Sequence, residues 1–267
     1  MFGSPLPPIV LKRSMQNNSQ TTMTRYTDQQ SDDPSEQAKV AFRVLIIGGM
    51  GQVGAAVVRA LVAEPSCAEV VMVNRTASPL MAHHCVRQVV MDTVALQFPA
   101  EVSKLALSMV AQGDPVYAAS CAGVGTGSRK WTEEELKALE IGVVGGFARG
   151  CHDGGVTQFG LLSAAGSNPN SRIRYARVMG LKEATVQGIG FERLAIFRPG
   201  IIGGNVHTPG YLAWLGRLIP GPYGTIDQDD IGRAFAAEFI NSSVQDSVVY
   251  LDNASMKQRS RAVGLWL

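Results

Sequence analysis

Residues 43–54 have the sequence RVLIIGGMGQVG, in which a short apolar run stops abruptly at glycines. The run at residues 44–47 is typical of a strand that is buried on both faces of a sheet. The residues that follow the glycines, GAAVVRALVA, place small side chains on one face of a helix. We therefore predict a strand, a tight glycine turn and a helix in direct succession.

The glycine turn predicts a binding site for a dinucleotide, because it satisfies both GxGxxG and GxxGxxG. Such a site needs a tight turn, close approach of the backbone to a pyrophosphate and close packing of the next helix. The N-terminus of that helix presents N–H groups and a positive dipole end to the phosphates. A ligand-free glycine turn is the competing interpretation. The candidate residues are Gly48, Gly49, Gly51, Gln52, Val53 and Gly54.

Short apolar runs alternate with helical stretches along the rest of the chain. The expected strands are residues 44–47, 70–73, 88–91, 117–121, 159–163 and 194–197, and the expected helices are residues 54–63, 131–149 and 175–186. The second of these helices begins with Thr132 and Glu135 at capping-box spacing. The alternation predicts an α/β fold with a doubly wound parallel sheet of the Rossmann type.

The end of the second expected strand bears on the choice of cofactor. NAD-preferring sites place Asp or Glu there to accept from the ribose 2′-hydroxyl, but residues 70–80 contain no carboxylate. Arg75, directly after Asn74, can instead face a 2′-phosphate, which favours NADP(H) over NAD(H); a solvated surface arginine is the alternative. Asp92 fits either a contact with the adenine amino group or a cap of the next helix. Gly123 lies in a glycine-rich stretch that either approaches the cofactor or is only a flexible loop.

Further along, Ser163 precedes Tyr175 by twelve residues, and the chain here resembles the atypical short-chain dehydrogenase/reductase superfamily. It is most similar to the branch of the Tat-interacting-protein-like oxidoreductases and their bacterial relatives. The resemblance covers roughly residues 42–250 and implies that Pro199 borders the nicotinamide. It rests on the segments GGMGQVG, VNRT, LLSAAGSNPNSRIRYARVMG, FERLAIFRPG and IDQDDIGRA.

The resemblance implies a catalytic serine, a tyrosine that donates a proton, and a lysine four residues beyond the tyrosine that lowers the tyrosine pKa. Tyr175 and Ser163 match the first two, but the lysine position is Met179, which can supply neither charge nor a hydrogen-bond donor. Ala164 stands where many members carry a second serine. Lys182, seven residues after Tyr175, faces the same side of the helix and is the candidate substitute. The alternative is a solvated lysine.

Two functions from different classes follow from these motifs. The first is an NADPH-dependent oxidoreductase that reduces a small carbonyl or quinone-like substrate, with Tyr175 as the proton donor. The second is a catalytically impaired NADP(H)-binding sensor or assembly protein, which Met179 favours. The identity of the substrate cannot be derived from the motifs, and a homodimer is an open alternative to a monomer.

Composition excludes other classes of function. The 24 Lys and Arg against 22 Asp and Glu leave no basic footprint for nucleic acid, and no apolar run approaches the length of a membrane span. The four cysteines are scattered, and we interpret them as buried thiols in a reducing compartment. The four histidines form no HxH or HExxH pattern, so no metal site is expected.

The domain prediction has three parts. Residues 1–38 are expected to form a disordered polar tail, residues 39–255 the Rossmann domain, and residues 256–267 a C-terminal tail. A lid region is expected at residues 203–226, which are rich in Gly and Pro. We expect a cytoplasmic location. Mitochondrial import is the alternative, because no acidic residue precedes Asp28 although basic residues do.

Overall fold

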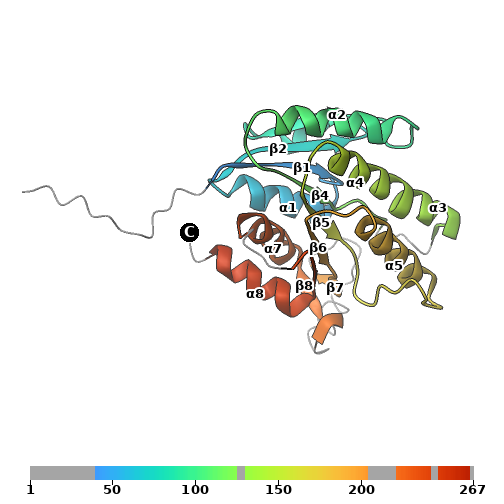
Figure 1. Ribbon diagram of the computed structural model, residues 1–267. Coiled ribbons are helices and arrows are strands. Elements are labelled where there is room, and N and C mark those ends of the chain that lie inside the picture. Colours follow the sequence, from blue (N-terminus) through green and yellow to red (C-terminus); the bar gives the residue numbers. More distant parts are fainter. Residues whose placement is uncertain (1–39, 125–129, 204–220, 242–245, 265–267) are drawn as a thin grey trace, which may run out of the picture. The chain divides into compact units, whose positions relative to one another are not determined.

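A computed structural model of the chain describes residues 40–124, 130–203, 221–241 and 246–264 (Figure 1). Within these residues a seven-stranded sheet has the order β3-β2-β1-β4-β5-β6-β9, and every neighbouring pair is parallel. The first six strands therefore follow the doubly wound Rossmann order, which confirms the predicted fold class. The strands are β1 (Phe42–Ile47), β2 (Cys67–Asn74), β3 (Val86–Val90), β4 (Val116–Ser120), β5 (Gln158–Leu162), β6 (Arg193–Phe197) and β9 (Val248–Leu251).

Helices cover both faces of this sheet (Figure 1). One core cluster packs α1, α7 and α8 against the sheet, and a second packs α2, α4 and α5 against the other face. The central strands are almost wholly buried, as their continuous apolar sequences require. The helices are α1 (Gln52–Val62), α2 (Phe98–Val110), α3 (Glu133–Lys137), α4 (Val144–Asp153), α5 (Arg174–Gln187), α7 (Gln228–Ile240) and α8 (Asn253–Gly264).

The helix that we predicted at residues 131–149 is an α3–α4 unit with a π-helical turn, η3 (Ala138–Val143), between its two parts. The predicted capping box is present. The Thr132 hydroxyl accepts from the N–H of Glu135, whose carboxylate accepts from the N–H of Thr132 at 2.7 Å. A π-helical turn widens a helix locally and is frequent at functional sites. Here it carries Glu140, whose side chain is buried.

The elements that were not predicted include α2, β9 and α8. The predicted C-terminal tail, residues 256–267, begins inside α8, which packs against α7 and buries Met256. Of the predicted lid, residues 221–226 contribute the short helix η4 (Gly221–Tyr223) and part of β8 (Thr225–Asp227), which pairs with β7 (Ile201–Gly203). The rest of the lid and the N-terminal tail lie outside the described residues. No helix of the described residues is long and apolar enough to cross a membrane.

Candidate functional site

The glycine turn between β1 and α1 is closed by the N–H of Gly51, which donates to the carbonyl of Gly48 at 3.0 Å. Gly48 has a positive φ of 79°, and a Cβ there would come within 2.3 Å of the backbone N of Ala122. A Cβ on Gly54 would lie 2.0 Å from the carbonyl oxygen of Gly48. The turn therefore requires glycine at both positions, and it ends where α1 begins, at Gln52.

A cavity of about 470 Å³ opens beside this turn. Its lining residues come from the glycine turn, the ends of β2 and β4, the segment after β3 and the α3–η3 unit. Predicted site residues among them are Gly48, Gly51, Asn74, Arg75 and Gly123, and unpredicted ones include Thr93, Val94, Trp131 and Leu139. The cavity thus lies at the carboxyl edge of the parallel strands, where open α/β sheets bind their ligands.

The remaining predicted residues of the nucleotide site lie behind or beside this cavity. A Cβ on Gly49 would meet the side chain of Met72, Gly54 packs against Gly48, and Gln52 and Val53 lie in the first turn of α1. The side chain of Asp92 accepts from the N–H of Val94 at 3.1 Å. The interpretation of Asp92 as a cap of the next helix is wrong, because α2 begins six residues later.

Arg75 is exposed and lines the cavity, and no hydrogen bond or ion pair engages its side chain within the described part of the chain. The loop that carries Arg75 is held to β3 by hydrogen bonds to Gln88. The Asn74 amide donates to the side-chain oxygen of Gln88 at 3.1 Å, and Gln88 makes two hydrogen bonds with the backbone of Ser78. An unpaired guanidinium on a braced loop can bind a phosphate without first breaking an ion pair.

A dinucleotide fits the residues that the structure brings together here. The turn leaves no space for a Cβ at Gly48 or Gly54, as backbone approach to a phosphate requires. The side-chain oxygen of Gln52 is buried without a hydrogen-bond partner in the described structure, at the N-terminus of α1. That helix end is a site for anions, and a buried amide oxygen without a partner calls for a hydrogen-bond donor, such as a hydroxyl group of a ligand.

The predicted catalytic serine lies directly after β5 and is bound to other side chains. The Ser163 hydroxyl donates a very short hydrogen bond to Glu183 and lies 3.1 Å from the Ser167 hydroxyl. Glu183 is buried, and Arg198 pairs with it through two contacts, of 2.9 and 2.5 Å. Glu183 raises the pKa of Arg198, which also lies over the ring of Tyr250. The Ser163 proton therefore points to Glu183.

Lys182 is not the solvated lysine of the alternative interpretation, because only 1% of it is exposed. Its Nζ donates to the carboxylate of Glu140 at 2.8 Å and to the carbonyl of Leu162 at 2.9 Å. Glu140 in turn accepts from the backbone N–H of Val124 at 3.2 Å, and a Cβ on Gly123 would approach that same oxygen to 3.0 Å. The Lys182–Glu140 ion pair thus connects α5, β5 and η3 to the wall of the cavity.

Tyr175, the predicted proton donor, lies in the first turn of α5 and is partly buried. Its hydroxyl makes no hydrogen bond within the described residues. Burial and the negative charge of Glu140 raise the pKa of its phenol above the ordinary value. Met179, at the lysine position of the resemblance, is buried. Tyr175 therefore stays protonated at neutral pH and carries a hydroxyl that can donate to a ligand.

The structure separates the predicted site residues into two groups. Ser163, Tyr175 and Lys182 do not line the cavity, and neither does Pro199, whose carbonyl accepts from the N–H of Ala165 at 2.8 Å. Sequence reasoning missed Glu140, Glu183 and Arg198, which make the contacts of this second group. Glu183 and Arg198 do lie inside or next to the segments that carry the resemblance, whereas no local motif singles out Glu140.

No family model matches the chain. Curated relatives include the mitochondrial protein fmp52 of Aspergillus fumigatus, 29% identical over 165 residues that cover 61% of this chain and 67% of that protein. The mitochondrial protein fmp52 of Emericella nidulans is 25% identical over 204 residues, which cover 72% and 84% of the two chains. Protein HTATIP2 of Rattus norvegicus is 43% identical over 49 residues, which cover 18% and 20%. The match spans about two thirds of several of these relatives.

Solved structures share the fold at low sequence identity. MoeE5 in complex with UDP-glucose and NAD has a TM-score of 0.57 at 13% identity, with 83% of this chain and 82% of that chain covered. The Bordetella bronchiseptica enzyme WbmH in complex with NAD⁺ has a TM-score of 0.59 at 15% identity, with 82% and 79% covered. These likenesses show the Rossmann architecture of the chain.

Proposed function

We propose that this chain, which belongs to the NAD(P)-binding atypical short-chain dehydrogenase/reductase superfamily, is an NADPH-dependent reductase of a small carbonyl or quinone-like compound. One observation carries the proposal. A cavity beside a glycine turn that leaves no space for a Cβ at Gly48 or Gly54 lies in the same domain as a protonated tyrosine whose hydroxyl makes no hydrogen bond within the described residues. When bound, the cofactor supplies a hydride to the substrate carbon.

In this proposal the chain holds the dinucleotide through the glycine turn and the N-terminus of α1. Arg75 binds a 2′-phosphate, since its guanidinium is unpaired and the loop offers no carboxylate that would bind a ribose hydroxyl instead. Asn74 supports Arg75 by holding its loop to β3 through Gln88. NADP(H) is therefore the expected cofactor.

Tyr175 donates its proton to the carbonyl oxygen of the substrate as the hydride reaches the carbon. The product is an alcohol, and the phenolate regains its proton from solvent. Because burial and Glu140 disfavour the phenolate, Tyr175 carries at neutral pH the proton that this step needs.

Lys182 acts in this scheme as a positioning residue and not as a substitute for the missing lysine. Its ammonium group is already bound by Glu140 and the Leu162 carbonyl. Through Glu140 it holds the N–H of Val124, next to the cavity residue Gly123. This buried network connects the segment after β4 to the middle of α5.

The second candidate function is a protein that binds NADP(H) without turnover. Met179 in the lysine position favours it, as does the Ser163 hydroxyl, whose proton is given to Glu183. The two functions differ in whether Tyr175 takes part in a reaction, and one experiment therefore distinguishes them.

The deciding experiment follows NADPH oxidation by the full chain against aldehydes, ketones and quinones, with Tyr175→Phe as the matched variant. Reductase function predicts substrate-dependent oxidation that falls about a hundredfold or more in Tyr175→Phe, since proton donors contribute at least that much. NADPH binding should be equal in both proteins. Bound NADPH that no substrate oxidises would contradict reductase function and support the second candidate.

For the location we propose mitochondria, the alternative raised by the N-terminal sequence. The fmp52 relatives from Aspergillus fumigatus and Candida albicans carry mitochondrial names, and no acidic residue precedes Asp28 in this chain. A fluorescent fusion of the full chain should enter mitochondria and lose that location when residues 1–38 are deleted. A cytoplasmic signal from the full-chain fusion would contradict this location.

A further inference from the structure

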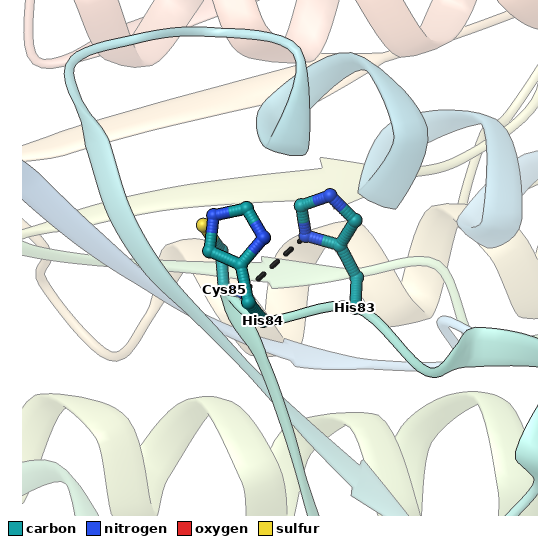
Figure 2. Close-up of side chains that lie close together, drawn as sticks. All are labelled: His83, His84 and Cys85. Carbon is teal, nitrogen blue, oxygen red and sulfur yellow. Dashed lines mark hydrogen bonds between the residues drawn. The ribbon is translucent and has the colours of Figure 1, made fainter.

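A surface turn before β3 gathers two imidazoles and a thiol, as Figure 2 shows: His83, His84 and Cys85. The turn is closed by the N–H of Val86, which donates to the His83 carbonyl at 2.9 Å. The Cys85 carbonyl accepts from the N–H of Val70 in β2 at 2.8 Å. The backbone that carries the three side chains is thus tied to the edge of the sheet.

The three side chains lie close enough to share one ion. A ligand atom from each lies within 4.8 Å of the others, and the two imidazole centroids are 4.3 Å apart. Tetrahedral zinc has N ligands near 2.0 Å and thiolate near 2.3 Å, which places the ligand atoms about 3.5 Å from one another. Both histidines are exposed and Cys85 is half-buried, so small side-chain rotations cover the difference.

We propose that His83, His84 and Cys85 bind a divalent ion of the zinc class. Two neutral imidazoles and one thiolate are a donor set of borderline softness, which suits zinc better than calcium or magnesium. The ion takes the thiolate form of Cys85, and the thiol proton is released to solvent. Three protein ligands leave a fourth position for water or an external ligand.

Local contacts oppose the ion only weakly. The N–H of Cys85 donates to Nδ1 of His83 at 3.3 Å, a long and exposed hydrogen bond that an ion at this nitrogen replaces. The positive charge of Arg87, two residues beyond Cys85, is compensated by Glu69, whose carboxylate lies 2.7 Å away. The turn therefore carries no strong interaction that has to be lost before metal binds.

Cys85 is the one cysteine suited to act as this ligand. The other three are buried. Burial raises the pKa of Cys67 and of Cys121 to about 12, and raises the pKa of Cys151 as well. A thiolate signal from bound metal therefore reports Cys85. The expectation that all four thiols are buried was wrong for Cys85. The expectation of no metal site rested on the spacings of metal ligands in strands and helices, which do not apply to a turn.

The proposed ion site is independent of the dinucleotide site. The turn precedes β3, whereas the cavity residues Thr93 and Val94 follow it. Five strand residues at roughly 3.3 Å each separate the two ends by about 17 Å. Loss of the metal should leave NADPH binding unchanged, so the failure of one proposal does not affect the other.

The test is a titration of the tag-free, reduced full chain with Co²⁺ in the absence of air, followed by displacement with Zn²⁺. Wild-type protein should show a thiolate-to-cobalt charge-transfer band and the visible bands of tetrahedral cobalt. Cys85→Ser should lose the charge-transfer band. His83→Gln and His84→Gln should each weaken Co²⁺ binding about a hundredfold, because losing even a hydrogen-bonding partner of a ligand costs 10–100-fold.

His152→Gln is the matched control, since His152 is also partly exposed but lies in α4, outside the turn. It should bind Co²⁺ as wild type does. A wild-type titration without a thiolate band would overturn the proposal. So would a band that persists in Cys85→Ser, or histidine variants that bind Co²⁺ as tightly as the control.

Discussion

The glycine-turn region and the α5 region of this domain use their polar groups in opposite ways. Beside the glycine turn, the Arg75 guanidinium and the buried oxygen of Gln52 have no partner in the described structure. Around α5, Ser163 and Arg198 both donate to Glu183, and Lys182 donates to Glu140. Groups without partners call for a ligand, whereas groups that satisfy each other hold the fold together. The polar groups of the first region are therefore available to a ligand. Those of the second region stabilise the fold, except for the hydroxyl of Tyr175, which has no partner among the described residues.

The largest expected effect tests the structural role of the α5 region. Lys182→Met should lower the free energy of unfolding by about 3–5 kcal/mol, because it leaves the buried carboxylate of Glu140 without its cation. Urea denaturation measures this loss. Adding Glu140→Gln should recover part of it, since the unpaired charge is then removed.

Lys137→Met serves as the control for this change. The Lys137 ammonium pairs with the partly exposed carboxylate of Glu133, and ion pairs at the surface contribute little. Its unfolding midpoint should remain close to that of wild type. Equal midpoints for Lys182→Met and Lys137→Met would show that the buried ion pair of the α5 region stabilises the fold no more than a surface pair does.

The next largest effect, on the reduction rate, concerns the positive charge that Met179 does not supply near Tyr175. Met179→Lys would place an ammonium one helical turn after Tyr175, where residues four apart are neighbours. We expect about a hundredfold gain in reduction rate, because a more acidic phenol is a better proton donor near neutral pH. Met179→Leu, which keeps the apolar volume, should show no gain.

The pH dependence of the reduction rate in the same variants shows in which direction the pKa of Tyr175 moves. The raised pKa of Tyr175 keeps the phenol protonated to above its ordinary value of about 10, so the wild-type rate should not fall in the mildly alkaline range on its account. In Met179→Lys the alkaline decline should move to lower pH. An unchanged profile in a folded variant that binds NADPH would mean that position 179 does not reach Tyr175.

The smallest effect tests cofactor preference in the glycine-turn region. Arg75→Ala should weaken NADPH binding about tenfold, the value of one hydrogen bond to a charged group, and leave NADH binding unchanged. Arg59→Ala, which removes an arginine whose partner is the exposed Asp229, is the control. Equal losses for the two cofactors in Arg75→Ala would contradict a 2′-phosphate contact.

The two regions also differ in how far the sequence predicts them. The glycine turn is predictable because its residues are contiguous and the constraint is local: a Cβ at Gly54 would meet the Gly48 carbonyl six residues earlier. The partner of Lys182 lies 42 residues away in a π-helical turn, so neither periodicity nor spacing points to it. The sequence-based choice of Lys182 did not anticipate Glu140, because tertiary packing brings η3 against α5.

The same distinction holds for the fold. The first six strands were predicted because each is a short apolar run followed by polar or glycine residues. By contrast β9 was missed: only Leu251 is buried in this strand at the edge of the sheet, so the apolar pattern is weak. Helix α8 was missed because its sequence is mostly polar and it is fixed by packing on α7.

The central claim is that the glycine-turn region binds NADPH, and calorimetric titration of the folded full chain tests it most directly. Wild type should bind NADPH saturably at one site, and more tightly than NADH. Gly54→Val should abolish binding because its side chain meets the Gly48 carbonyl, while Gly188→Ala, where a Cβ makes only ordinary contacts, should bind as wild type does. Circular dichroism would establish that each protein is folded. A folded wild-type chain that fails to bind NADPH, or a Gly54→Val chain that binds it undiminished, would contradict the account.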